Sequence, residues 1–173
     1  MLRRQQIKTI MIMKEKTQVI AEKDKQELFI IREVDIPRDS VFQAFIDPEI
    51  LVQFFAPFEN TMHFNYHDYR TGGNYSWCNK NKEGKTLCTF SGVIHELSSP
   101  ERIIQTSEFM ELPERGNAIL EILKFEELSN NRTKIIIHDI CPSVATRDAM
   151  INSGMEKGLV DIFNKLDRLF NNF

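Results

Sequence analysis

The sequence predicts an α+β fold: a curved antiparallel sheet of about six to seven strands wrapped around one long C-terminal helix, with two short helices after the first strand. Residues 153–173 space their apolar side chains at helical intervals. The middle of the chain instead shows short segments of period-two alternation, separated by turn residues such as Gly, Pro and Asn. Consecutive strands joined by short turns, with helices toward the two ends of the chain, are typical of this fold class.

Composition and charge narrow the function classes. The chain has 173 residues, of which 42% are hydrophobic and 27% charged, so one globular domain is expected. Its net charge of −3 gives no general attraction to nucleic acid or to an anionic membrane, and neither is an expected partner. The three cysteines form no metal-binding pattern, and their odd number suits a reducing compartment. We therefore expect a cytoplasmic protein without metal or cofactor.

The N-terminal segment is basic. Residues 1–16 carry Arg3, Arg4, Lys8, Lys14 and Lys16 against a single acidic residue. The apolar run at 10–13 is too short for the core of a signal peptide. We expect residues 1–16 to form a flexible tail and residues 17–173 to form the domain.

Two β-rich runs open the domain, Thr17–Ala21 and Glu27–Ile36, and they form either a hairpin or one bent strand. Pro37 ends this part of the sheet because it has no N–H group to pair. Asp39 or Ser40 can cap the helix that follows. A second short helix is expected over Glu49–Phe55, with Pro48 in its first turn.

Five or six further strands follow, recognised by side chains that alternate between two faces. Met62, Phe64 and Tyr66 share one face of the first, and His63, Asn65 and His67 share the other. Tyr75 and Trp77 point together from the next. The later strands are expected at Thr86–Leu97, Arg102–Met110, Ala118–Leu128 and Thr133–Cys141.

The last helix carries a narrow apolar stripe on an otherwise polar surface. Ser153 and Glu156 have the spacing of a capping box, which predicts that the helix begins there. A coiled coil is the alternative, but only one such stretch of about three heptads occurs. The stripe consists of Met155, Leu159, Ile162, Leu166, Leu169 and Phe173, widened by Phe163 and Phe170.

Several segments together resemble the Aha-type branch of the START-like, or birch-pollen-allergen-like (SRPBCC), superfamily. The resemblance covers about residues 29–169 and rests on the order and spacing of the segments. They are Val34-Asp35-Ile36-Pro37, Val41-Phe42-Gln43-Ala44-Phe45, Asp47-Pro48-Glu49, Phe54-Phe55-Ala56-Pro57, Asp68-Tyr69-Arg70-Thr71-Gly72-Gly73-Asn74-Tyr75, Gly92-Val93-Ile94, Pro100-Glu101-Arg102-Ile103, Gly154-Met155, Gly158 and Leu166-Asp167-Arg168-Leu169.

This resemblance implies a helix-grip fold with a cavity between the sheet and the last helix, but it implies no single activity. Members of the superfamily include co-chaperone domains that stimulate a heat-shock chaperone ATPase, small-molecule binders and cyclases. The chain departs from the pattern at Phe54 and Phe55, where the branch commonly has two Trp, and at Leu159, where a Trp is usual. Both changes leave more room or a softer wall in the cavity.

The histidines give weak signals for chemistry. His63 and His67 lie about 13 Å apart on one strand face, too far to share a metal ion, and the solvent face is expected for them and for His138. His95 can face either side of its strand and is a candidate for the pocket. Glu121 alternates with Leu120 and Ile122, and a buried carboxylate there would be a candidate base because burial raises its pKa.

Cys78 and Cys88 are symmetric about the centre of the hairpin loop at 81–85, which predicts that they stand opposite each other. Two reduced, packed thiols are expected, with a strained cross-strand disulfide as the alternative. A Ser or Cys nucleophile with an evident His and carboxylate is not apparent, so no catalytic residue is assigned.

The sequence thus favours a non-catalytic domain that binds a small hydrophobic or amphipathic molecule. The alternatives are a module that regulates an ATP-dependent chaperone and a cyclase- or hydrolase-like enzyme that uses a pocket His or Glu. A monomer or a homodimer is expected. The residues expected around the ligand are Phe54, Phe55, Phe64, Tyr66, Tyr75, Trp77, His95, Phe109, Met150, Met155, Leu159 and Phe163.

Overall fold

The computed structural model describes residues 9–14 and 16–171. One nine-stranded antiparallel sheet, in the order β1-β2-β3-β9-β8-β7-β6-β5-β4, forms the body of the molecule. The strands are β1 (Thr9–Lys14), β2 (Thr17–Glu22), β3 (Glu27–Val34), β4 (Thr61–His67), β5 (Asn74–Lys80), β6 (Thr86–Ser98), β7 (Arg102–Phe109), β8 (Ile119–Leu128) and β9 (Arg132–Ile140). The helices are α1 (Arg38–Ile46), α2 (Pro48–Phe54), α3 (Val144–Asn152) and α4 (Met155–Asn171).

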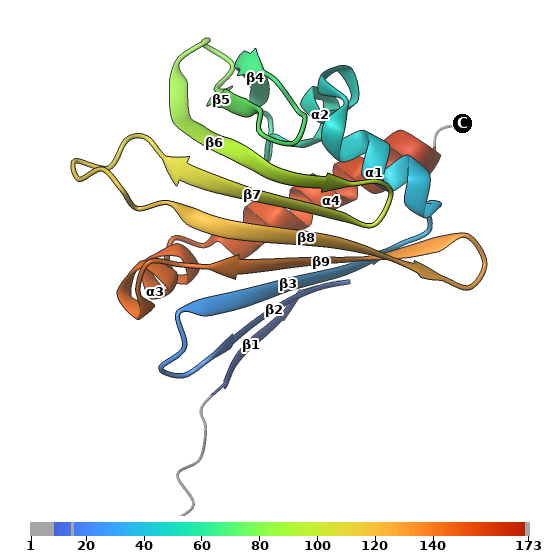
Figure 1. Ribbon diagram of the computed structural model, residues 1–173, viewed down its shortest axis with the longest axis horizontal. Helices are drawn as coiled ribbons and strands as arrows, with labels where there is room; N and C mark the ends of the chain where they lie inside the picture. The colour runs from blue at the N-terminus through green and yellow to red at the C-terminus, as the bar shows by residue number, and fades with distance from the viewer. Residues whose placement is uncertain (1–8, 15, 172–173) are drawn as a thin grey trace, which may run out of the picture.

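The sheet curves around α4, which runs along one of its faces, while α1 and α2 lie near the C-terminal end of α4 (Figure 1). We call the face of the sheet that is turned toward α4 the inner face. Its central part is apolar and fully buried at Ile94, Ile103, Phe125 and Ile135. The predicted α+β class, antiparallel sheet and C-terminal helix are therefore confirmed, and the arrangement fits a helix-grip fold.

The sheet has nine strands rather than six to seven, and the described residues contain four helices rather than three. The two β-rich runs at the start of the domain form the hairpin β2–β3 and not one bent strand. The unpredicted helix α3 is short, and its N-cap Ser143 accepts a hydrogen bond from the backbone N–H of Thr146 at 3.1 Å.

Residues 9–14, which were expected to belong to a flexible tail, form the edge strand β1 in register with β2. The Ile12 side chain packs against the apolar core, whereas Ile10 and Met11 are exposed. Residues 1–8 and 15 of the expected tail lie outside the described residues. The pairing explains the difference, because a short apolar run is sufficient for an edge strand when a neighbouring strand already exists.

Helix α4 begins at Met155 and not at a Ser153 capping box. Ser153 instead caps the C-terminus of α3, where its hydroxyl donates to the carbonyl of Met150 at 2.6 Å. Gly154 then turns the chain with a positive φ of 79°. The stripe is confirmed at Ile162, Phe163 and Leu166, which are buried. Phe173 lies outside the described residues.

Two polar contacts fasten the second half of α4. On one side, the buried Arg32 of β3 donates to Asp167 at 2.5 Å and to Asn164 at 3.1 Å. On the other, Lys165 donates to the carbonyls of Ala56 and Phe58 in the loop after α2. Polar side chains of α4 therefore take part in holding the helix against the rest of the molecule.

The hairpin β5–β6 does not place its two cysteines opposite each other. Cys78 pairs with Thr89, and Cys88 pairs with Asn79, because the register is shifted from symmetry about the loop. Both thiols are free, as is that of Cys141. Within the described chain, none of the helices combines the length and apolar character that crossing a membrane requires.

Candidate functional site

An aromatic row crosses the inner face on the side of the sheet that ends at β4. Phe64 of β4 pairs directly with Trp77 of β5, Trp77 with Phe90 of β6, and Phe90 with Phe109 of β7. The rings of Trp77 and Phe90 are stacked with centroids 4.6 Å apart, and those of Phe90 and Phe109 are 5.4 Å apart. Trp77 is buried, but the other three members of the row are only half-buried. The row thus offers an incompletely covered aromatic surface.

Three polar side chains form a second row on the same face, which we call the polar row: Gln105 of β7, Glu121 of β8 and Asp139 of β9. Gln105 pairs directly with Glu121, and Glu121 with Asp139. The Gln105 amide donates to Oε2 of Glu121 at 2.6 Å. Asp139 is 4% exposed, and its Oδ1 has no hydrogen-bond partner in the part of the chain that is described.

Burial controls the protonation of the two carboxyl groups. It raises the pKa of Asp139 well above the usual value, and the charge of Glu121 raises it further. Burial also raises the pKa of Glu121, while the hydrogen bond from Gln105 acts in the opposite direction. Directly opposed residues in a sheet have Cβ atoms about 4.5–5.5 Å apart. The two groups therefore titrate as a pair that retains a proton more readily than exposed carboxyl groups do.

Tyr75 lies between the two rows on β5. Its hydroxyl donates to the backbone carbonyl of Thr106 at 2.8 Å, so this polar group is already used within the fold. Gly92 makes room for this ring, because a Cβ there would lie 2.7 Å from the Tyr75 hydroxyl and 1.8 Å from the Thr106 oxygen. Burial, with a smaller effect from Glu121, raises the pKa values of Tyr75 and Tyr69, so both hydroxyls stay protonated at neutral pH.

A β-bulge in β4 reverses the expected faces of Tyr66 and His67. The pairing with β5 shifts between Phe64 and Tyr66, so Asn65 is an extra residue. Tyr66 is consequently 48% exposed instead of facing the pocket, and its hydroxyl is 3.2 Å from that of Ser91. His67 turns inward and stacks on Tyr69 with ring centroids 4.3 Å apart. Burial lowers the pKa of His67, with smaller opposing effects from nearby backbone carbonyls and Asp47.

His95 is exposed on the outer face beside Val93, so it does not lie with the residues expected around a ligand. Its neighbour Ile94, which is completely buried, occupies the inner face instead. His63 is exposed as expected, and His138 lies on the outer face, where it stacks on Phe29 at 4.2 Å.

The other residues expected around a ligand differ in their burial. Phe54 and Phe163 are completely or almost completely buried and belong to the core. Phe55 lies edge-on to Trp77, with ring centroids 5.6 Å apart, and so extends the aromatic row. Met150, Met155 and Leu159 are half-buried, the last two in the first half of α4. The sulfur of Met150 lies 3.6 Å from that of Cys141.

Sequence reasoning missed Phe90, Gln105 and Asp139. The signal for Asp139 was present, because placing His138 on the surface requires Asp139 to face inward with Ile137. Predicting Gln105 and Phe90 as site residues requires knowing how neighbouring strands pair. The alternation along a single strand does not give that pairing.

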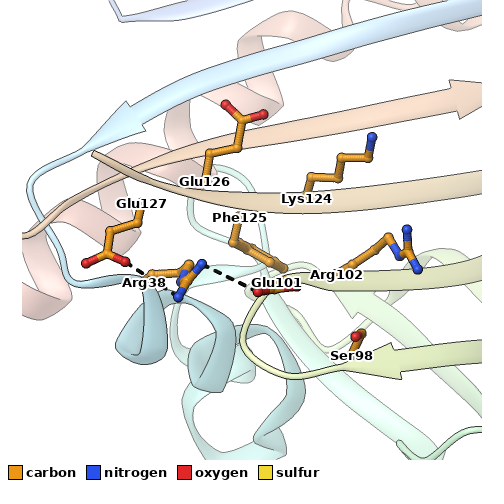
Figure 2. A pocket seen from close by; sticks show the side chains of 8 residues that line it. All are labelled: Arg38, Ser98, Glu101, Arg102, Lys124, Phe125, Glu126 and Glu127. Atoms are coloured by element: carbon orange, nitrogen blue, oxygen red, sulfur yellow. Dashed lines mark ion pairs between the residues drawn. The ribbon is translucent and has the colours of Figure 1, made fainter. Parts of the chain in front are cut away.

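A surface hollow of about 490 Å³ lies at the other end of β6–β8, against the N-terminus of α1. Figure 2 shows Arg38 between Glu101 and Glu127, to which it forms ion pairs of 4.0 and 3.5 Å. The eight lining residues are Arg38, Ser98, Glu101, Arg102, Lys124, Phe125, Glu126 and Glu127. These pairs join α1 to the sheet, and we assign the hollow a structural role. Among the described residues, no cluster of His, Cys, Asp and Glu is suited to hold a metal ion.

Comparison with known proteins supports the fold and gives the family. A family model described as Activator of Hsp90 ATPase homolog 1-like protein, AHSA1, matches residues 35–171. The chain belongs to this family. The match confirms the resemblance to the Aha-type branch, and the AHSA1 fold is consistent with a ligand-binding domain. A comparison with curated protein sequences gives no match.

Solved structures similar to this AHSA1 protein share its fold at low sequence identity. A crystal structure of a Rhodobacter sphaeroides protein has a TM-score of 0.81 at 17% identity, covering 92% of this chain and all 100% of that one. A Chromobacterium violaceum protein has a TM-score of 0.72 at 23% identity, covering 83% of this chain and 96% of that one. A Staphylococcus epidermidis protein solved by NMR has a TM-score of 0.75 at 21% identity, covering 87% and 93%.

Proposed function

We propose that the protein binds a small amphipathic molecule between the inner face of the sheet and the first half of α4. The observation that carries the proposal is the aromatic row Phe64–Trp77–Phe90–Phe109, three of whose members are only half-buried. Large aromatic side chains normally gain free energy from complete burial, so an incompletely covered row on the inner face of the sheet favours a bound apolar group. The first turns of α4 show the same incomplete burial, since Met155 and Leu159 are half-buried whereas Ile162 and Leu166 in the middle of the helix are buried.

Titration with an apolar dye such as ANS, followed by the fluorescence of Trp77, tests this proposal, because Trp77 is the single Trp of the chain. A saturable change is expected. Phe90→Leu should weaken the binding at least about fivefold by removing a stacked ring. Phe29→Leu is the matched control, because Phe29 stacks on His138 at the outer face and should leave the binding unchanged. No saturable response to ANS, together with no small molecule in native mass spectra of the purified protein, would contradict the proposal.

A chaperone-regulating module is the second candidate, and the description of the family favours it. In this case the working surface is the outside of the molecule and an ATP-dependent chaperone is the partner. Adding the protein to a purified Hsp90-type ATPase should then raise the rate of ATP hydrolysis. Phe90→Leu should leave this stimulation unchanged, which distinguishes the module from a ligand-dependent activity.

The buried carboxyl pair favours a third candidate, an enzyme that uses Glu121 as an acid or base. Cys141 is a poor nucleophile for such an enzyme, because burial, assisted by the charge of Asp139, raises the pKa of its thiol to about 11. Hydrolysis of p-nitrophenyl esters that is lost in Glu121→Gln would support this candidate. Equal rates with and without the protein would argue against ester hydrolysis.

A further inference from the structure

We propose that the polar row recognises a protonated amine, so that the ligand is a cationic amphipathic molecule. This inference rests on the ligand-binding function proposed above. It assigns the Glu121–Asp139 pair as the subsite for the charged end and the aromatic row as the subsite for the apolar body.

The first argument is the unused hydrogen-bonding capacity of the pair. Gln105 satisfies Oε2 of Glu121, but Oδ1 of Asp139 is buried and has no partner among the described residues. A buried carboxyl oxygen without a donor costs free energy that a folded protein seldom leaves uncompensated. An ammonium group carries up to three N–H donors and no acceptor, and it matches a site made of carboxyl oxygens.

The second argument is that the chain supplies no cation of its own to the pair. The two buried arginines are committed elsewhere: Arg32 to Asp167, and Arg147 to Asp148 and to the carbonyl of Glu22. In the described part of the chain, neither Glu121 nor Asp139 forms an ion pair with Lys, Arg or His. A ligand cation would compensate the negative charge that burial otherwise disfavours.

The third argument is the distance between the two subsites. Phe109 and Gln105 lie on the same face of β7, four residues apart, which corresponds to about 13 Å along the strand. Ser107 lies between these two residues on β7 and pairs with Ile119 of β8. An extended chain of about ten carbon atoms spans this distance, so the apolar body and the amine of one ligand can reach both rows.

Three probes with the same ten-carbon chain test the inference: decylamine, 1-decanol and decanoate, each titrated by calorimetry below its solubility limit at pH 7. Decylamine should bind at least about tenfold more tightly than decanol, and decanoate should bind most weakly. Asp139→Asn and Glu121→Gln should each reduce the amine-to-alcohol ratio of affinities at least about fivefold. These two replacements keep the shape of the side chain and remove its capacity to carry a negative charge beside a bound cation.

Glu126→Gln is the matched control, because Glu126 is an exposed carboxylate on the same strand as Glu121 and should leave the ratio unchanged. Circular dichroism of each variant verifies the fold. If one of the two variants fails to fold, the other still tests the inference. Equal affinities for amine and alcohol in the wild type would overturn the inference and leave the binding proposal standing. An unchanged ratio in both variants would also overturn it. Failure of all three probes to bind, with no response to ANS, would overturn both proposals.

Discussion

At the scale of single residues, the least usual feature is a pair of opposed carboxyl groups on the inner face of the sheet. The native state binds protons at Asp139 and Glu121 more tightly than the unfolded chain does, because burial raises both pKa values. Their contribution to stability is therefore fully present below the ordinary Asp pKa of 3.8 and is lost as the pH rises through the raised values. The pair weakens the fold at neutral pH, which is common for residues retained for function.

The variant Asp139→Asn tests whether the raised pKa of Asp139 makes the stability of the protein depend on pH. The difference in melting temperature between variant and wild type should grow in favour of the variant as the pH rises from about 4 to 8, because only the wild type must ionise or keep a proton at this site. Thermal unfolding at several pH values provides the measurement. A difference that stays constant over this range would show that Asp139 has the same pKa in the folded and unfolded chain.

Arg32 and Asp167 form the main buried charge contact of α4. Asp167→Ala leaves the guanidinium of Arg32, which is 2% exposed, without its carboxylate, and should lower the free energy of unfolding by about 3 kcal/mol. Arg168→Ala, at an exposed position on the same helix, should change it by less than about 0.5 kcal/mol. Urea denaturation measures both. Similar losses from the two variants would mean that the ion pair does not hold the helix.

At the scale of elements, the edge strand β1 is paired with β2 along its length, and among its described side chains Ile12 adds a contact with the core. Ile12 packs against the core, while Met11 on the opposite face is 59% exposed. Ile12→Asp should therefore cost about 2–3 kcal/mol, and Met11→Asp less than about 0.5 kcal/mol. Chemical denaturation of the two variants measures the difference. If neither substitution changes the stability, β1 contributes nothing to the fold in solution.

The two halves of α4 should also differ in their local stability. The second half is held by Arg32, Lys165 and three buried apolar side chains, whereas Met155 and Leu159 in the first half are half-buried. Amide hydrogen exchange should be slower over residues 162–169 than over 155–159. A bound ligand should slow the exchange of the first half selectively. Uniform exchange along the helix, unchanged by any ligand that binds, would place the ligand elsewhere.

At the scale of the whole molecule, the succession of antiparallel strands after α2 and the long C-terminal helix could be predicted because hydrophobic periodicity and turn residues are local signals, whereas β1 and α3 were missed. The inward position of Glu121 was open for the same reason: alternation shows which residues share a face, but only pairing with Gln105 and Asp139 shows which face is buried. The faces of Tyr66 and His67 were beyond reach, because the sequence around Asn65 contains no glycine or proline to mark a bulge. The hydrogen bond of 2.5 Å that Asp161 accepts from the Phe58 N–H joins distant segments, and the helical period of α4 alone gives no signal for it.

The bulge at Asn65 also bears on how the protein avoids aggregation. β4 is the last strand of the sheet, so its outer edge offers unpaired backbone groups to any passing chain. The extra residue, held by a hydrogen bond of 3.0 Å from Asn65 to Ser76, interrupts the regular spacing of those groups. Intermolecular pairing along this edge therefore has only a short regular segment to begin from, which disfavours extension of the sheet into a fibril.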